Sequence, residues 1–127
     1  MAIGYDKQTM LFLANKAMQS TWEEAQKIFG LKIGAMPEIV MNGRMTTCAG
    51  RAHLDDCLMH LSCYLFERNR QEFLDVTIPH ELCHFIAWRL YKDGGHGKAW
   101  KQTMMLMGLK PEIYHKMITK YEASKCK

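Results

Sequence analysis

The chain of 127 residues has the length of one domain, which we place at residues 1–127. A hydrophobic fraction of 48% and a charged fraction of 24% are typical of a globular protein. No apolar stretch is long enough to span a membrane, so an integral membrane protein is excluded. The formal net charge of +4 permits an acidic partner such as nucleic acid without requiring one.

Cysteine usage and the N-terminal residues indicate the compartment. The five cysteines form no C-x-x-C pair, and their odd number does not suggest a disulfide framework. The apolar run at residues 10–14 is too short for a secretory signal. We therefore expect a reducing, cytoplasmic environment.

Residues 6–29 are predicted to form a long amphipathic helix, because apolar residues recur at steps of three and four. The apolar face consists of Leu11, Ala14, Met18, Trp22, Ala25 and Phe29. Gly30 follows as a suitable C-terminal stop. This helix is expected to cover a sheet and to support the second long helix of the chain.

Three strands are predicted after this helix. Residues 38–41 read as the first strand, and Asn42-Gly43 is a strong signal for a tight hairpin turn. Residues 44–52 would then form the return strand, and residues 58–61 a third strand. The pattern predicts an α+β fold with a small antiparallel sheet of about three strands packed against helices.

The most informative stretch is His80-Glu81-Leu82-Cys83-His84, within a helix predicted over residues 76–92. Positions i and i+4 share one helix face, so His80 and His84 can direct two imidazoles at one metal ion. Glu81 lies near the same face, where it can act as general base in this H-E-x-x-H arrangement. Cys83 points away from that face by helical spacing and is interpreted as a core residue.

A catalytic zinc needs a third protein ligand, and His96 in a glycine-rich turn is the preferred candidate. Glu112, on a final helix predicted from Pro111 to Ala123, is the alternative. Asp93 is either a carboxylate that orients a ligand histidine or an ordinary turn residue. A further helix is predicted over residues 98–107, with Trp100 on its core face.

Three segments resemble the SprT-like zinc metallopeptidases, which are relatives of Spartan: residues 77–84, residues 95–100 and residues 105–108. Residues 42–50 and 59–62 are similar to two further segments of that family. The resemblance implies a zincin-like fold, in which the strand near residues 59–62 borders the cleft. It also implies one zinc ion per chain, held by His80, His84 and His96, with Glu81 as the catalytic acid/base. Many members carry a cysteine-rich zinc ribbon after the core, whereas only Cys126 remains in this tail.

The resemblance further implies hydrolysis of a protein or peptide substrate, often a protein associated with DNA. Lys92, Lys98 and Lys101 are the candidates for contacts with DNA. Two alternatives stay open: a non-catalytic, zinc-stabilised module that binds nucleic acid or protein, and a zinc hydrolase with a substrate other than protein. A histidine-rich site also accepts several other first-row metal ions.

Overall fold

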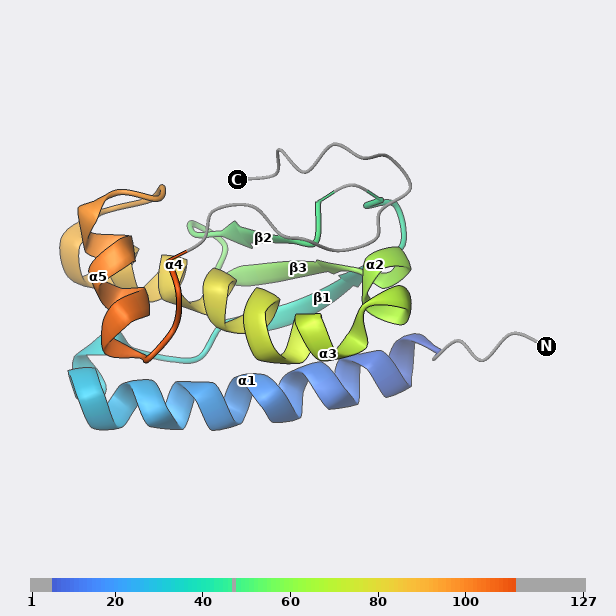
Figure 1. The fold of residues 1–127 in the computed structure, drawn as a ribbon, viewed down its shortest axis with the longest axis horizontal. Helices are drawn as coiled ribbons and strands as arrows, with labels where there is room; N and C mark the ends of the chain where they lie inside the picture. The colour runs from blue at the N-terminus through green and yellow to red at the C-terminus, as the bar shows by residue number, and fades with distance from the viewer. Residues whose placement is uncertain (1–5, 47, 112–127) are drawn as a thin grey trace.

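The computed structural model describes residues 6–46 and 48–111, and over these residues the predicted α+β class is confirmed. A three-stranded sheet is covered by helices, as Figure 1 shows. In chain order the elements are α1 (Lys7–Phe29), the 3₁₀ turn η1 (Leu31–Ile33), β1 (Glu38–Asn42), β2 (Gly50–His53), β3 (Leu58–Ser62), α2 (Cys63–Arg68), α3 (Arg70–Glu72), the π-helical turn η2 (Phe73–Thr77), α4 (Ile78–Tyr91) and α5 (Lys98–Leu106).

Helix α1 begins and ends where the sequence predicts. The Asp6 side chain accepts a hydrogen bond from the Thr9 backbone N–H at 2.7 Å, which caps the first turn. Gly30 ends the helix with a φ of 85°, a conformation that costs glycine little. The helix runs along one side of the molecule (Figure 1), where it packs against β1 and α4.

The sheet has the strand order β1-β3-β2 and is mixed. Strand β2 pairs antiparallel with β3, whereas β1 pairs parallel with β3. The predicted hairpin between residues 38–41 and residues 44–52 is therefore wrong, and so is an antiparallel arrangement throughout. The tight antiparallel connection instead joins β2 to β3.

Side-chain contacts explain why the chain leaves β1 without pairing to β2. The Asn42 side chain accepts a hydrogen bond from the Arg44 N–H at 2.8 Å and lies 3.2 Å from Nδ1 of His60 on β3. The asparagine thus forms a local turn and contacts the strand that does pair with β1. Strand β3 also contributes Met59 and Leu61, each 0% exposed, and the central position buries both.

Helix α4 continues the helical path of α3 and η2, so the chain is helical from residue 70 to residue 91. The predicted helix over residues 76–92 matches α4 to within two residues at each end, and the helical path extends further upstream through η2 and α3. Pro79 has no N–H to donate, and its ring would clash with the carbonyl four residues earlier in a regular helix. The π-helical turn at Phe73–Thr77 lies directly before it and changes the hydrogen-bond pattern there.

Arg89 ties the far end of α4 to the loop after η1. Its Nη1 atom donates to the carbonyls of Ile33 at 2.7 Å and Ala35 at 2.5 Å. Its guanidinium carbon lies 5.6 Å from the ring centroid of Trp22 on α1. One charged side chain thus connects three segments that are distant in sequence.

We expect Arg89→Ala to lower the free energy of unfolding by about 2–3 kcal/mol, because two carbonyls lose a charged donor. Urea denaturation of the metal-free protein measures the change. Lys27→Ala is the control, since Lys27 forms only an exposed pair with Glu24 at 3.8 Å and should change stability by less than about 0.5 kcal/mol. Equal losses in both variants would contradict the connecting role of Arg89.

Some predictions are not met by the described residues, and some lie outside them. Cys48 is disulfide-bonded, so cysteine usage gives no argument for a reducing compartment. Cys57, Cys63 and Cys83 are free thiols.

The predicted helix over residues 111–123, with Glu112, lies almost entirely beyond residue 111 and hence outside the described part. No helix within residues 6–46 and 48–111 is long and apolar enough to cross a membrane.

Candidate metal centre

Three imidazoles converge at the junction of α4 and α5. His80 and His84 lie one turn apart on α4, and His96 comes from the loop before α5. The Nε2 atom of His96 lies 3.2 Å from Nε2 of His80 and 3.1 Å from Nε2 of His84. One ligand atom of each residue falls within 4.8 Å of the others, so the three could hold a metal ion. Within the described residues no other such group of three is found.

The spacing fits a single ion. Imidazole nitrogens at 2.0–2.1 Å from a tetrahedral ion are separated by about 3.3 Å. Hydrogen bonds among the three rings explain these distances less well. Each Nε2 atom of a neutral imidazole is either a donor or an acceptor, and Nε2 of His96 faces the Nε2 atoms of both His80 and His84. The all-nitrogen donor set suits zinc and several other first-row ions.

His84 is held in the neutral form that can bind a metal. Burial and, to a smaller extent, the neighbouring His80 and His96 together lower the pKa of His84 to about 3. A neutral imidazole keeps the lone pair that a metal needs, so no proton has to be removed from His84 at neutral pH.

Trp100 forms one wall of the cluster. Its ring centroid lies 4.8 Å from that of His80, 5.3 Å from that of His84 and 4.5 Å from that of His96. Its indole N–H donates to the backbone carbonyl of His80 at 3.3 Å. The sequence places Trp100 in the core, which is correct, but not against the three imidazoles. Helix spacing does not indicate this contact, because His96 lies in the loop that precedes α5.

Glu81 places a carboxylate beside the imidazoles, with Oε2 3.8 Å from Nε2 of His80. The residue is 5% exposed, and Oε1 is buried without a hydrogen-bond partner among the described residues. Burial raises the pKa of Glu81 to about 8, against the lowering effects of the Ala52 backbone and the Arg51 charge. A buried carboxylate oxygen without a hydrogen bond lowers stability unless a partner such as water donates one to it.

Gly50 on β2 makes room for the Glu81 side chain. A Cβ atom at Gly50 would lie 2.9 Å from Cγ of Glu81 and 3.3 Å from a methyl carbon of Leu61. Only glycine therefore permits this approach of strand to helix. Nothing in the residue spacing relates residue 50 to residue 81, so the sequence gives no sign of this role of Gly50.

Strand β2, and not the strand near residues 59–62, borders the candidate site. Strand β3 has a neighbour on each side and so presents no edge, which makes that expectation wrong. Strand β2 is an edge strand of the sheet and approaches α4 at Gly50.

The other histidines and Cys83 lie outside the cluster or outside the described residues. His53 and His60 contact each other, with ring centroids 4.3 Å apart, and neither belongs to the cluster. Cys83 is 0% exposed, which confirms it as a core residue, and burial raises its pKa to about 12. His115 lies outside the described residues.

Comparison with known proteins gives a consistent result. The model of the SprT-like family matches residues 16–123. The chain is 37% identical over 79 residues to the protein named SprT of Pseudomonas aeruginosa, covering 60% of this chain and 48% of that one. It is 33% identical over 93 residues to the SprT of Cronobacter sakazakii, covering 70% and 55% of the two chains. The chain thus spans about half the length of these curated relatives. No solved structure matches it.

Proposed function

The chain belongs to the SprT-like family, and on that premise we propose that it is a zinc-dependent metallopeptidase. His80, His84 and His96 would hold the zinc, and Glu81 would be the catalytic acid/base. The substrate would be a protein or peptide, and a protein associated with DNA is the narrower expectation.

The observation that carries the proposal is the state of Glu81. Its carboxylate is buried, lies 3.8 Å from a ligand nitrogen and has one oxygen without a partner among the described residues. A zinc site that only stabilises a fold has no need of such a group, and burying it reduces stability. Catalysis explains it, because a base next to a reacting water must be close and poorly solvated.

Each residue of the site has a definite task. Zinc held by three imidazoles would lower the pKa of a water towards neutrality and polarise the carbonyl to be cleaved. Glu81 would accept the proton from the attacking water and deliver it to the leaving amine. Burial raises the pKa of Glu81 in the metal-free protein, and the positive charge of a bound zinc would lower it towards the carboxylate form that accepts a proton.

The sheet has an edge along which a peptide substrate can bind. An extended peptide can lie along an edge strand and pair with it through main-chain hydrogen bonds. Strand β2 is the edge strand that contacts Glu81 through Gly50. A peptide lying along β2 would bring its backbone to the carboxylate with little demand on its side chains.

The proposal is tested by incubating the zinc-loaded protein with unfolded casein, with and without single-stranded DNA, and following fragments by mass spectrometry. Cleavage that a chelator abolishes and zinc restores is expected. Cleavage only with DNA would extend the proposal to DNA-associated substrates. Zinc binding without cleavage in any arm would contradict it and favour a non-catalytic binding module.

Gly50→Ala is expected to slow casein cleavage on the order of 100-fold, because the new methyl group displaces the Glu81 side chain. Zinc affinity should stay within about twofold, since Gly50 contacts none of the three histidines among its nearest atoms. Cleavage rate and chelator competition are the two measurements.

Gly43→Ala is the matched control for Gly50→Ala. A Cβ atom at Gly43 would meet only the end of Lys7, at 3.7 Å, which is an ordinary contact. It should cleave casein like the wild type. A Gly50→Ala variant with wild-type cleavage would show that Glu81 does not depend on the space left at β2.

A further inference from the structure

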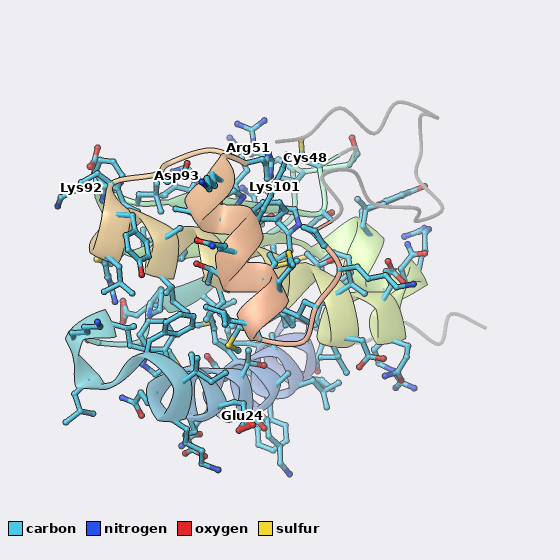
Figure 2. All side chains as sticks on the ribbon, turned by 60° about the vertical axis from the view of Figure 1, so that its left-hand side comes forward. Glu24, Cys48, Arg51, Lys92, Asp93 and Lys101 are labelled. Atoms are coloured by element: carbon cyan, nitrogen blue, oxygen red, sulfur yellow. The ribbon has the colours of Figure 1, made fainter. Side chains whose placement is uncertain are left out.

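The Asp93 side chain organises the loop that carries His96. Its Oδ1 atom accepts a hydrogen bond from the Gly95 N–H at 3.0 Å, and its Oδ2 atom accepts one from the Trp100 N–H at 3.1 Å. Figure 2 shows Asp93 beside the first turn of α5. One carboxylate thus binds a backbone group on each side of His96.

The first turn of α5 depends on this carboxylate. The N-cap position is Gly97, which has no side chain with which to cap, and the first turn contains no acidic residue. The first N–H groups of a helix have no partner within the helix. Asp93 binds the N–H of the third residue of α5, and its negative charge also suits the positive end of the helix.

Without the hydrogen bonds of Asp93, the loop at residues 94–97 would be loosely held. Three of the four residues from position 94 to position 97 are glycines, which have the largest conformational freedom in the unfolded or unbound state. His96 is the fourth residue. Without an anchor, ordering this loop would cost free energy each time a metal is bound.

The Asp93 carboxylate lies close to the position that a Cβ atom would take at Gly97 but not to the equivalent position at Gly95. A Cβ atom at Gly97 would lie 2.8 Å from Oδ2 and 3.2 Å from Oδ1 of Asp93. A Cβ atom at Gly95 would meet nothing within 4 Å. Neither glycine has a positive φ that alanine would resist, so the two positions differ mainly in their contact with the carboxylate.

We propose that Asp93 is a positioning residue that holds the Gly94–Gly97 loop in place, so that His96 stands ready as the third ligand before a metal ion arrives. The inference rests on the proposed zinc site, but concerns the pre-organisation of the site and not the reaction. Asp93 acts on the backbone around His96, which differs from the expectation that it orients a ligand imidazole directly.

Three variants test the role of Asp93, with zinc affinity measured by competition with a chromogenic chelator. Asp93→Asn retains the size of the side chain but presents an NH₂ group to one of two N–H donors, so one hydrogen bond is lost. We expect a loss of zinc affinity of about 10- to 100-fold. Gly97→Ala should give a loss in the same range, and Gly95→Ala should stay within about twofold of the wild type.

The metal-free proteins provide a second measurement, which does not depend on zinc or on activity. Exchange of the Trp100 amide hydrogen should be slow in the wild type and faster in Asp93→Asn, with the amides of α1 unchanged as an internal reference. In the cobalt-loaded proteins, Asp93→Asn and Gly97→Ala should change the visible absorption spectrum, while Gly95→Ala should not.

The outcomes separate this inference from the proposed function. Wild-type zinc binding with unaltered affinity in Asp93→Asn and Gly97→Ala would overturn the role of Asp93 and leave the zinc site standing. Equal losses in Gly97→Ala and Gly95→Ala would also overturn it, because the carboxylate contact would then be irrelevant. A wild-type protein that binds no zinc would overturn both.

Discussion

The Glu81→Gln variant is expected to bind zinc as tightly as the wild type and to cleave unfolded casein about 10²- to 10⁴-fold more slowly. Glutamine keeps the shape of the side chain but cannot accept a proton. The imidazole nitrogens of the cluster are unchanged by the substitution, so the affinity for zinc should be unchanged as well. Steady-state cleavage and chelator competition measure the two quantities separately.

The same substitution lowers the cleavage rate but is not expected to lower the stability of the protein. Burial raises the pKa of Glu81 from 4.5 to about 8 in the metal-free protein. Between these pH values the folded chain binds a proton that the unfolded chain releases, so stability falls as the pH rises through this window. Glutamine removes that dependence. Metal-free Glu81→Gln should therefore unfold at a urea concentration equal to or above that of the wild type at pH 8.

Three results would contradict this role of Glu81. Loss of zinc together with activity would mean that Glu81 supports the metal and is not only a base. Loss of stability at pH 8 in the metal-free variant would mean that the carboxylate contributes to the fold. Casein cleavage at the wild-type rate would remove Glu81 from the reaction altogether.

The His96→Ala variant is expected to lose at least about 100-fold in zinc affinity, a larger effect than the loss of a residue that only supports a ligand. Two imidazoles at i and i+4 remain, which is fewer than the three protein ligands usual for a catalytic zinc. Chelator competition measures the loss directly. Zinc should also raise the melting temperature of the variant less than that of the wild type, because stabilisation by a ligand follows its affinity.

His53→Ala is the matched control for His96→Ala. His53 is also a histidine of the described part, but it contacts His60 on the sheet and is outside the cluster. Its loss should leave zinc affinity within about twofold. Unchanged affinity in His96→Ala would exclude His96 as a ligand and leave Glu112, the alternative that the sequence offers, as the next residue to replace.

The amino-acid sequence determined the parts of the site that depend on local geometry. The spacing of His80 and His84 places them on one helix face, and the structure brings both within reach of His96. Asp6 and Gly30 define the ends of α1 because capping and positive φ are properties of single residues and their neighbours. The α+β class follows in the same way from the periodicity of apolar residues.

The tertiary structure alone decided how the strands are ordered. Asn42-Gly43 is a turn signal, but the side chain of Asn42 contacts β3, and the apolar positions of β3 are buried most fully between two neighbours. Turn chemistry acts over four residues, whereas the position of β3 depends on contacts with helices far along the chain. The local preference for a hairpin is therefore overridden, and β2 becomes the edge strand at the site.

The supporting contacts of the site were also decided only in three dimensions. Gly50 gives space to Glu81 across 31 positions of sequence, Trp100 packs on all three imidazoles, and Arg89 joins α4 to the loop after η1. Residue spacing predicts which side chains share a helix face, because helix geometry is fixed by the backbone. It does not predict which segments meet, because that depends on how the apolar surfaces of the whole chain pack together.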